Sequence, residues 1–161
     1  MITFEFMPSN LEVFEKNMAL NPELAQRITL ARNPIWSVND TDLFVSGSGP
    51  GTSVSPTPKR PDAVAVKTLT IDDMVSRTAV PRVDFIKMDI EGAEMHALKG
   101  ASATIKQFKP KLAICVYHDL SDFWTVPQFV QSLGLDYEFY FGHYTPHVEE
   151  SVVFDRPHVQ A

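Results

Sequence analysis

Two apolar stretches, Val83-Asp84-Phe85-Ile86-Lys87-Met88-Asp89-Ile90 and Lys111-Leu112-Ala113-Ile114-Cys115-Val116-Tyr117-His118, decide the fold of this 161-residue chain. Nearly continuous apolar runs of this kind are typical of strands that are covered on both faces. Between them, apolar residues at helical spacing predict a helical segment over residues 91–108, which Gly100 divides into two shorter helices. Strand, helix and strand in this order form a βαβ crossover, so we expect the two strands to be parallel.

The rest of the chain continues the alternation of strands and helices. We expect strands over residues 1–6, 27–31, 42–45 and 63–68, a helix that Pro8 and Ser9 open and Asn21-Pro22 closes, and a short helix over 71–76. A helix over 126–133 and strands over 137–141 and 150–154 follow, and the last two strands form an antiparallel hairpin because no helix separates them. Residues 46–61, rich in Gly, Pro and Ser, are predicted to be a long loop within a single domain that spans 1–161.

Composition narrows the class of protein. Hydrophobic residues make up 44 % of the chain and charged residues 21 %, as in soluble globular domains. The net charge of −6 argues against a nucleic-acid partner, which requires a basic face. No apolar run is long enough to cross a membrane, and the start of the chain lacks the pattern of a secretion signal. The single cysteine, Cys115, is expected in a buried strand and fits a reducing compartment, so we predict a cytoplasmic protein.

Polar residues that end the predicted strands are the candidates for a site, because ligands of open α/β sheets bind beyond the carboxyl ends of the strands. Glu5 ends the first strand, where its carboxylate can accept hydrogen bonds from a ribose diol or simply favour a helix N-terminus. Asp89, Glu91 and Glu94 fall within one strand-to-helix turn. Stabilisation of acids by the helix dipole accounts for the presence of the two glutamates. It accounts less well for Asp89, because a carboxylate beside a buried strand requires a partner.

His118 ends the next strand, where it is either a general base or a loop histidine with no role. Adjacent strands would bring it toward Asp89. A cluster of Asp, Glu and His side chains can also hold a divalent cation, but their spacing fits no dedicated metal motif, so we predict no metal. His143 and Tyr144 follow the penultimate predicted strand and can line the same rim of the sheet.

With these motifs placed, the chain resembles the FkbM family of methyltransferases. The resemblance is carried by Phe85-Ile86-Lys87-Met88-Asp89-Ile90-Glu91-Gly92-Ala93-Glu94 with Leu98-Lys99-Gly100-Ala101, by Val66-Lys67-Thr68-Leu69-Thr70-Ile71-Asp72-Asp73, and by Phe4-Glu5 with Pro8-Ser9-Asn10. Lys109-Pro110-Lys111, Val116-Tyr117-His118, His143-Tyr144 and Glu150 extend it almost to the end of the chain.

The resemblance implies an α/β fold of the Rossmann-like class I methyltransferase type, with a mostly parallel sheet, helices on both faces and a C-terminal antiparallel hairpin. It implies S-adenosylmethionine as cofactor, with Glu5 at its ribose, Trp36 at its adenine and Asp89 beside the methyl donor. His118 and Asp89 are then the catalytic candidates. Glu91, Glu94, His143 and Tyr144 are the candidates for binding the substrate, a hydroxyl-bearing small molecule or glycan.

The chain departs from the family pattern at its start. The family's first strand and Gly-rich cofactor turn precede the segment that begins here at Ile2, so we expect an N-terminally truncated domain. Gly47, Gly49 and Gly51 lie in a Pro/Ser-rich stretch after a different strand and are not that turn. Without the first strand, the strands of Glu5 and Asp89 are expected to have exposed edges that invite self-association.

Two readings of function remain at this stage. The leading one is a methyltransferase that acts on a hydroxyl oxygen. The alternative is a catalytically inactive, truncated protein of the same fold. A different nucleotide-binding α/β protein is disfavoured, since the Gly-rich turn that it requires is also absent.

Overall fold

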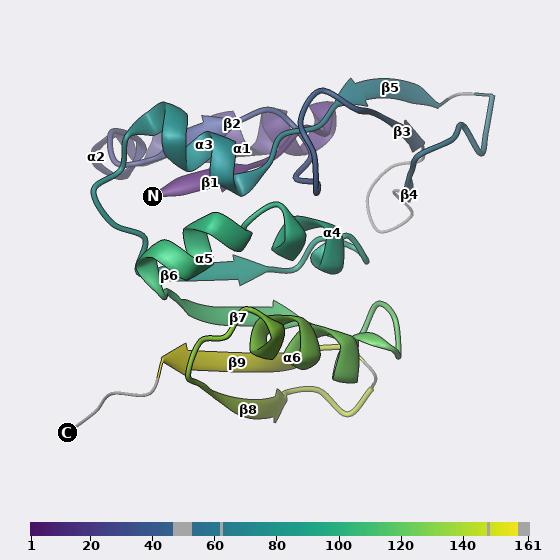
Figure 1. Cartoon of the computed structure of the whole chain (residues 1–161). Coiled ribbons are helices and arrows are strands. Elements are labelled where there is room, and N and C mark those ends of the chain that lie inside the picture. The colour runs from purple at the N-terminus through teal and green to yellow at the C-terminus, as the bar shows by residue number, and fades with distance from the viewer. Residues whose placement is uncertain (47–52, 62, 148, 158–161) are drawn as a thin grey trace. The chain divides into compact units, whose positions relative to one another are not determined.

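The computed structural model describes residues 1–46, 53–61, 63–147 and 149–157 (Figure 1). The chain divides into two compact units, residues 1–69 and 70–161, and each unit is described by itself. The single domain predicted over 1–161 stays a prediction.

The first unit contains one small parallel and one antiparallel sheet. Strand β1 (Ile2–Phe4) leads to helices α1 (Pro8–Leu20) and α2 (Pro22–Ala25), and then β2 (Thr29–Ala31) pairs with β1 in parallel. Strands β3 (Asp42–Ser46), β4 (Ser53–Ser55) and β5 (Val64–Lys67) form an antiparallel sheet with β3 in the centre.

Two local expectations for this unit differ from the structure. The predicted loop over 46–61 is wrong at Ser53–Ser55, which pairs with β3 as strand β4. Residues 47–52, with Gly47, Gly49 and Gly51, lie outside the described residues. Helix α1 opens at Pro8 as expected, but Ser9, a residue type that commonly caps helices, lies inside the helix, and the N-cap residue Met7 provides no side-chain cap.

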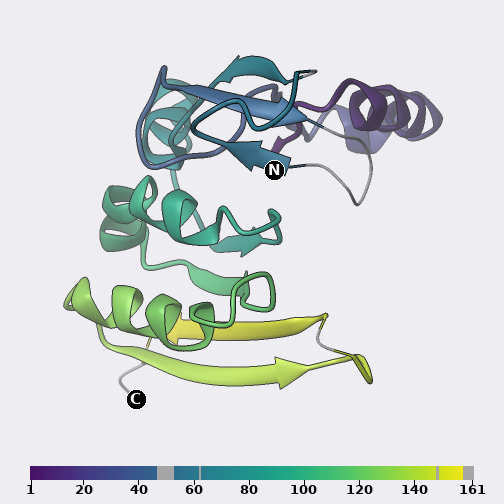
Figure 2. The ribbon, with the colours of Figure 1, turned by 90° about the vertical axis from the view of Figure 1, so that its right-hand side faces the viewer.

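The second unit contains a mixed four-stranded sheet. Its elements are α3 (Ile71–Thr78), β6 (Phe85–Met88), α4 (Glu94–Lys99), α5 (Ser102–Phe108), β7 (Lys111–Cys115), α6 (Asp122–Ser132), β8 (Tyr137–His143) and β9 (Ser151–Pro157). The strand order is β6-β7-β9-β8, and helices α4, α5 and α6 lie on the same face of this sheet (Figure 2). Gly100 separates α4 from α5, as predicted.

The predicted mostly parallel sheet is wrong. Among the described strands, only β1 with β2 and β6 with β7 pair in parallel, and β9 runs antiparallel to both β7 and β8. The physical reason is the connection from β8 to β9, which is too short for the crossover that a parallel pair requires. The expected C-terminal hairpin is therefore present, and it is the part that makes the sheet mixed.

The core of this unit lies between its helices and sheet. Leu98, Ile105, Ile114, Val126, Val130 and Val153 are fully buried, and burying a side chain of this kind stabilises the fold by about 1.5–3 kcal/mol. A smaller apolar cluster of Ala113, Cys115 and Val152 is packed by Tyr117 and Phe154. Cys115 is buried in its strand, as the sequence predicted. Burial raises the pKa of its thiol to about 12, so the thiol is protonated and unreactive at neutral pH.

Strands β1 and β6 lie at the edges of their sheets, as the sequence predicted. Among the described strands, β1 pairs with β2 alone and β6 pairs with β7 alone, so each has one unpaired edge. No helix in the described residues is long and apolar enough to cross a membrane.

Candidate active site

The carboxyl ends of β6 and β7 bring Asp89 and His118 together. The two strands are parallel neighbours with Met88 opposite Ile114, so the residues that follow them emerge at the same edge of the sheet. Nε2 of His118 lies 3.8 Å from Oδ1 of Asp89. The predicted proximity of these two side chains is therefore present in the structure.

A tight turn after β6 supplies the remaining acids. Glu91 and Gly92 have positive φ angles of 57° and 88°, and α4 begins two residues later at Glu94. The turn folds the side chain of Glu94 back toward the strand, where its Oε1 accepts a hydrogen bond of 2.8 Å from the backbone N–H of Ile90. Glycine suits its position because the left-handed region carries a penalty for residues with a Cβ.

Carboxylates lie near both nitrogen atoms of the His118 imidazole. Nδ1 lies 3.0 Å from Oε1 of Glu94, and Nε2 lies 3.6 Å from Oε2 of Glu91. The side chain of His118 is 11 % exposed, that of Glu91 64 % and that of Glu94 0 %. Glu91 is thus open to an incoming molecule, whereas Glu94 faces the protein interior and contacts His118.

Asp89 is held by two neighbours. The hydroxyl of Tyr117 donates a 2.9 Å hydrogen bond to Oδ1, and Nζ of Lys87 lies 3.3 Å from Oδ2. Burial by itself raises the pKa of Asp89, but the Tyr117 hydrogen bond and the charge of Lys87 outweigh it, so the pKa lies below its ordinary value. Asp89 is therefore ionised at neutral pH.

The pKa of Glu94 is shifted in the direction opposite to that of Asp89. Burial raises the pKa of its carboxyl above the ordinary value, although the Ile90 N–H and the charge of His118 act against that rise. Its second oxygen, Oε2, has no hydrogen-bond partner in the described residues.

His143 and Tyr144, also predicted for the site, lie at the end of β8 in the hairpin. Nδ1 of His143 is 2.9 Å from Oγ of Ser151, and Tyr144 is 65 % exposed with its ring edge toward Phe154. Both of these contacts join residues of the hairpin, and neither involves Asp89 or His118. The hairpin still influences the cluster, because the charge of Glu150 is among the causes that raise the pKa of Tyr117, after burial and the hydrogen bond with Asp89.

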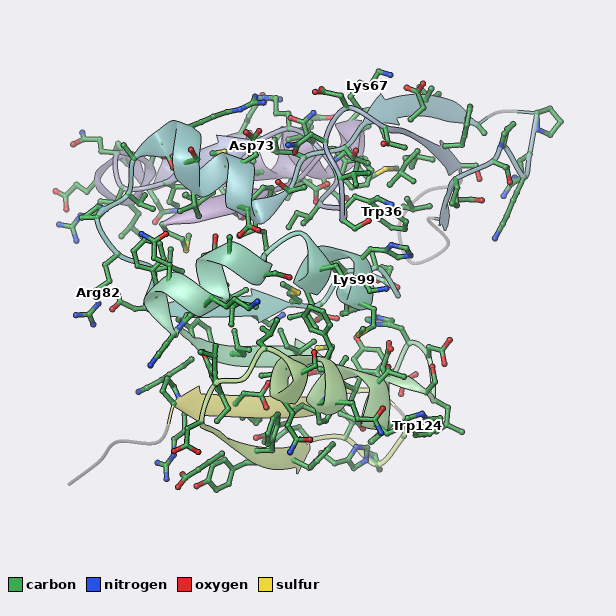
Figure 3. The ribbon with its side chains drawn as sticks, in the orientation of Figure 1. Trp36, Lys67, Asp73, Arg82, Lys99 and Trp124 are labelled. Carbon is green, nitrogen blue, oxygen red and sulfur yellow. The ribbon has the colours of Figure 1, made fainter. Side chains whose placement is uncertain are left out.

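Glu5 and Trp36 belong to the first unit and are described there alone. Oε1 of Glu5 accepts hydrogen bonds from the N–H groups of Phe6 and Met7 at 2.7 and 2.8 Å, and Oε2 accepts one from Asn10 at 3.0 Å. A carboxylate has about four acceptor positions, so one remains for a ligand hydroxyl. Trp36, labelled in Figure 3, is half-buried. Its backbone N–H donates to the carbonyl of Leu69.

Sequence reasoning missed Tyr117 as a partner of Asp89. The contact of Lys87 with an acid is what its place in an apolar strand indicates, since a charged residue there requires a nearby partner. One ligand atom from each of Asp89, Glu94 and His118 lies within 4.8 Å of the others, a set of one imidazole and two carboxylates that a divalent cation accepts. The expectation of no metal stays a prediction.

The fold and the cluster define an α/β protein with an acid–histidine site at the strand ends, and comparison with known proteins gives its family. Residues 1–149 match the model of the Methyltransferase FkbM domain, and the chain belongs to this family. The crystal structure of Methyltransferase FkbM from Methylobacillus flagellatus KT is similar, with a TM-score of 0.72 and 27 % sequence identity. The match covers 96 % of this chain and 36 % of that chain, so this chain spans about a third of that protein's length. A search of curated proteins found no match.

Proposed function

We propose that this chain takes part in the transfer of a methyl group from S-adenosylmethionine to a hydroxyl oxygen of a small molecule or glycan. Membership of the FkbM methyltransferase-domain family supports the reaction class. The observation that carries the proposal is the placement of ionised Asp89 and of His118 beside each other at the ends of parallel strands. This is the edge at which open α/β sheets bind ligands.

Three side chains are proposed to hold the cofactor. Glu5 would accept a hydrogen bond from one ribose hydroxyl with its remaining acceptor position, and Trp36 would offer a surface to the adenine. Asp89 is ionised at neutral pH, and its negative charge suits a sulfonium cation. When bound, S-adenosylmethionine supplies an electrophilic methyl group. The residues present therefore fit the cofactor in charge and in hydrogen-bonding capacity.

The imidazole of His118 is proposed to be the general base. Its Nε2 would accept the proton of the acceptor hydroxyl, and the bound cofactor would supply the methyl group to that oxygen. Glu91 is exposed next to Nε2 and would orient the hydroxyl, with His143 and Tyr144 contacting more distant parts of the acceptor. Because a sulfonium methyl donor would leave as a neutral thioether, positioning of the oxygen would contribute a large share of the acceleration.

Titration calorimetry of the chain with S-adenosylmethionine tests the cofactor part of the proposal. We expect binding that weakens in Asp89→Ala and stays unchanged in Asp136→Ala, an exposed aspartate outside the site. Absence of binding at millimolar cofactor would show that this chain by itself does not hold it.

A methyl-transfer assay with hydroxyl-bearing acceptors tests the role of His118. His118→Ala should lower the rate by roughly 100-fold, the lower end of the usual contribution of a general base. His147→Ala removes an exposed histidine of the hairpin and is the matched control. Equal rates for the two variants would exclude His118 as the base.

A further inference from the structure

Two buried polar atoms of the cluster have no hydrogen-bond partner among the described residues, namely Nδ1 of His118 and Oε2 of Glu94. The side chain of Glu94 is 0 % exposed, and that of His118 is 11 % exposed. Nδ1 lies 3.0 Å from the other oxygen of Glu94, Oε1, without forming a hydrogen bond to it. Polar atoms that are buried without a partner are costly, so this pair suits a ligand that contacts both side chains.

The surroundings of these atoms carry an excess of negative charge. Asp89, Glu91 and Glu94 approach the imidazole of His118 from β6 and the turn after it, and Asp122 on α6 acts through its charge on both Glu94 and His118. Among the described residues, a lysine or arginine forms an ion pair with just one of these four acids, Asp89. A cation is therefore the kind of ligand that the cluster favours.

We propose that Asp89, Glu94 and His118 form a binding site for a divalent transition-metal cation such as Zn²⁺. One ligand atom from each of the three residues lies within 4.8 Å of the others. Zn²⁺ binds imidazole nitrogen and carboxylate oxygen at about 2.0–2.2 Å, so two atoms that share it lie roughly 3–3.5 Å apart. Nδ1 of His118 and Oε1 of Glu94, at 3.0 Å, already have the separation of two such ligands.

Both carboxylates are also held in the way that metal ligands usually are. The N–H of Ile90 donates to Oε1 of Glu94, and the hydroxyl of Tyr117 donates to Oδ1 of Asp89. Hydrogen bonds of this kind orient the ligands of a metal. A carboxylate has about four acceptor positions, so each group can keep its hydrogen bond and still bind a cation.

The presence of an imidazole decides which cations fit. Mg²⁺ and Ca²⁺ prefer oxygen ligands alone, whereas Zn²⁺ accepts a mixed set of imidazole and carboxylates. Three protein ligands leave the fourth position of a tetrahedral Zn²⁺ to water. We therefore expect the cluster to bind Zn²⁺ in preference to Mg²⁺.

Binding of the cation would exclude His118 from acting as a base. A neutral imidazole that binds a metal through one nitrogen carries its proton on the other, so no nitrogen remains to accept a proton. This consequence rests on the proposed function, whereas the binding of the cation does not. The methyl transfer proposed above needs no metal, and the cation-bound chain would be its inactive state.

Titration calorimetry of the chelator-treated full chain with Zn²⁺ tests the site without any methyl transfer. We expect one bound Zn²⁺ per chain and an affinity for Mg²⁺ that is lower by tenfold or more. Glu94→Gln and Asp89→Asn should each weaken the binding of Zn²⁺ by roughly tenfold or more, since even groups that support a metal ligand contribute about 10–100-fold. Asp136→Asn and His147→Ala change exposed residues outside the cluster and should bind as the wild type does.

Two results would overturn the assignment. One is the absence of stoichiometric Zn²⁺ binding by the wild-type chain, a measurement that requires no variant to fold. The other comes from nitrogen-15 NMR of the wild type, in which Zn²⁺ should shift the resonances of the His118 imidazole. If one equivalent shifts those of His147 instead, the cation binds elsewhere.

In an active form of the protein, the rate of methyl transfer gives a separate readout. One equivalent of Zn²⁺ should lower the rate by tenfold or more, and a chelator should restore it. A chain that binds Zn²⁺ at this cluster and keeps its full rate would retain the metal site, and it would disprove His118 as the base of the proposed reaction.

Discussion

The hydroxyl of Tyr117 donates a hydrogen bond of 2.9 Å to Oδ1 of Asp89 and so joins the ends of β7 and β6. The bond stabilises the ionised form of Asp89, and with Lys87 it outweighs the effect of burial on the pKa of that carboxyl. A lowered pKa means that Asp89 stabilises the fold above its unfolded pKa, and that this contribution is lost as the pH falls through the folded pKa.

Tyr117→Phe should raise the pKa of Asp89 and destabilise the fold by about 0.5–1.5 kcal/mol, the usual net contribution of a hydrogen bond. Carbon-13 NMR titration of the carboxyl measures the first effect, and denaturant unfolding measures the second. Tyr140→Phe is the matched control, because the Tyr140 hydroxyl donates to Glu138 at 2.8 Å on the exposed hairpin. An unchanged Asp89 titration in Tyr117→Phe would contradict the argument.

Asp155 should make the stability of the second unit fall as the pH rises. The residue is 1 % exposed in β9, neither oxygen has a hydrogen-bond partner in the described residues, and burial raises its pKa to about 7. A raised carboxyl pKa stabilises the fold below the unfolded value, and this contribution is lost as the pH rises through the folded pKa.

Replacing this carboxyl should remove the pH dependence that it causes. Between pH 4 and pH 8 the free energy of unfolding of the wild type should lose up to roughly 4 kcal/mol through Asp155, at 1.36 kcal/mol per pKa unit, and Asp155→Asn should lack that loss. Asp136→Asn, at an exposed site, should follow the wild type. The difference between the two unfolding curves isolates the effect, and parallel curves would disprove it.

Gly92→Ala should disturb the site, because the φ angle of +88° is unfavourable for alanine whereas the space is sufficient. The new Cβ would lie 3.8 Å from Cβ of His118, an ordinary contact. We expect a loss of about 1–2 kcal/mol from the left-handed backbone. Gly134, with φ of +71° and open space around it, is the control.

Gly134→Ala should cost a similar amount of stability while the NMR signals of His118 stay in place. Gly92→Ala should move them, because it alters the turn between Asp89 and Glu94. Equal displacement of the His118 signals in both variants would contradict a specific role for the Gly92 turn.

Asp72 should contribute more to stability than its neighbour Asp73. The carboxylate of Asp72 accepts hydrogen bonds from the N–H groups of Ala103 and Thr104 at 3.0 and 2.7 Å, and it thereby caps helix α5 from α3. The helix has no cap of its own, because its N-cap residue is Ala101.

Asp72→Ala should therefore cost about 0.5–2 kcal/mol, the usual loss on removing a capping side chain. Asp73 pairs with Arg77 one turn along α3, and Asp73→Ala should cost about 0.5 kcal/mol or less. Chemical denaturation of the two variants compares them directly. A larger loss for Asp73→Ala would show that α5 does not depend on the side chain of Asp72.

The sequence predicted most elements of the chain because their signals are local. Apolar runs placed β6 and β7, helical spacing placed α4 and α5, and Gly100 marked their boundary. It also predicted that Asp89 and His118 would meet, since the carboxyl ends of neighbouring parallel strands share an edge. The family followed from the Asp89–Glu94 segment and its flanking strands, and the family model confirms it.

The roles within the cluster were decided by tertiary structure. The spacing of Glu91 and Glu94 placed both acids on one turn, yet one is 64 % exposed and the other 0 %. This difference arises because the side chain of Glu94 folds back toward Ile90 and His118, whereas that of Glu91 stays at the surface of the turn. Tertiary structure also decided that the sheet is mixed, because the direction of β9 depends on how the β8–β9 hairpin pairs with β7. Burial and pairing between distant segments are properties of the folded chain, so local patterns in the sequence do not contain them.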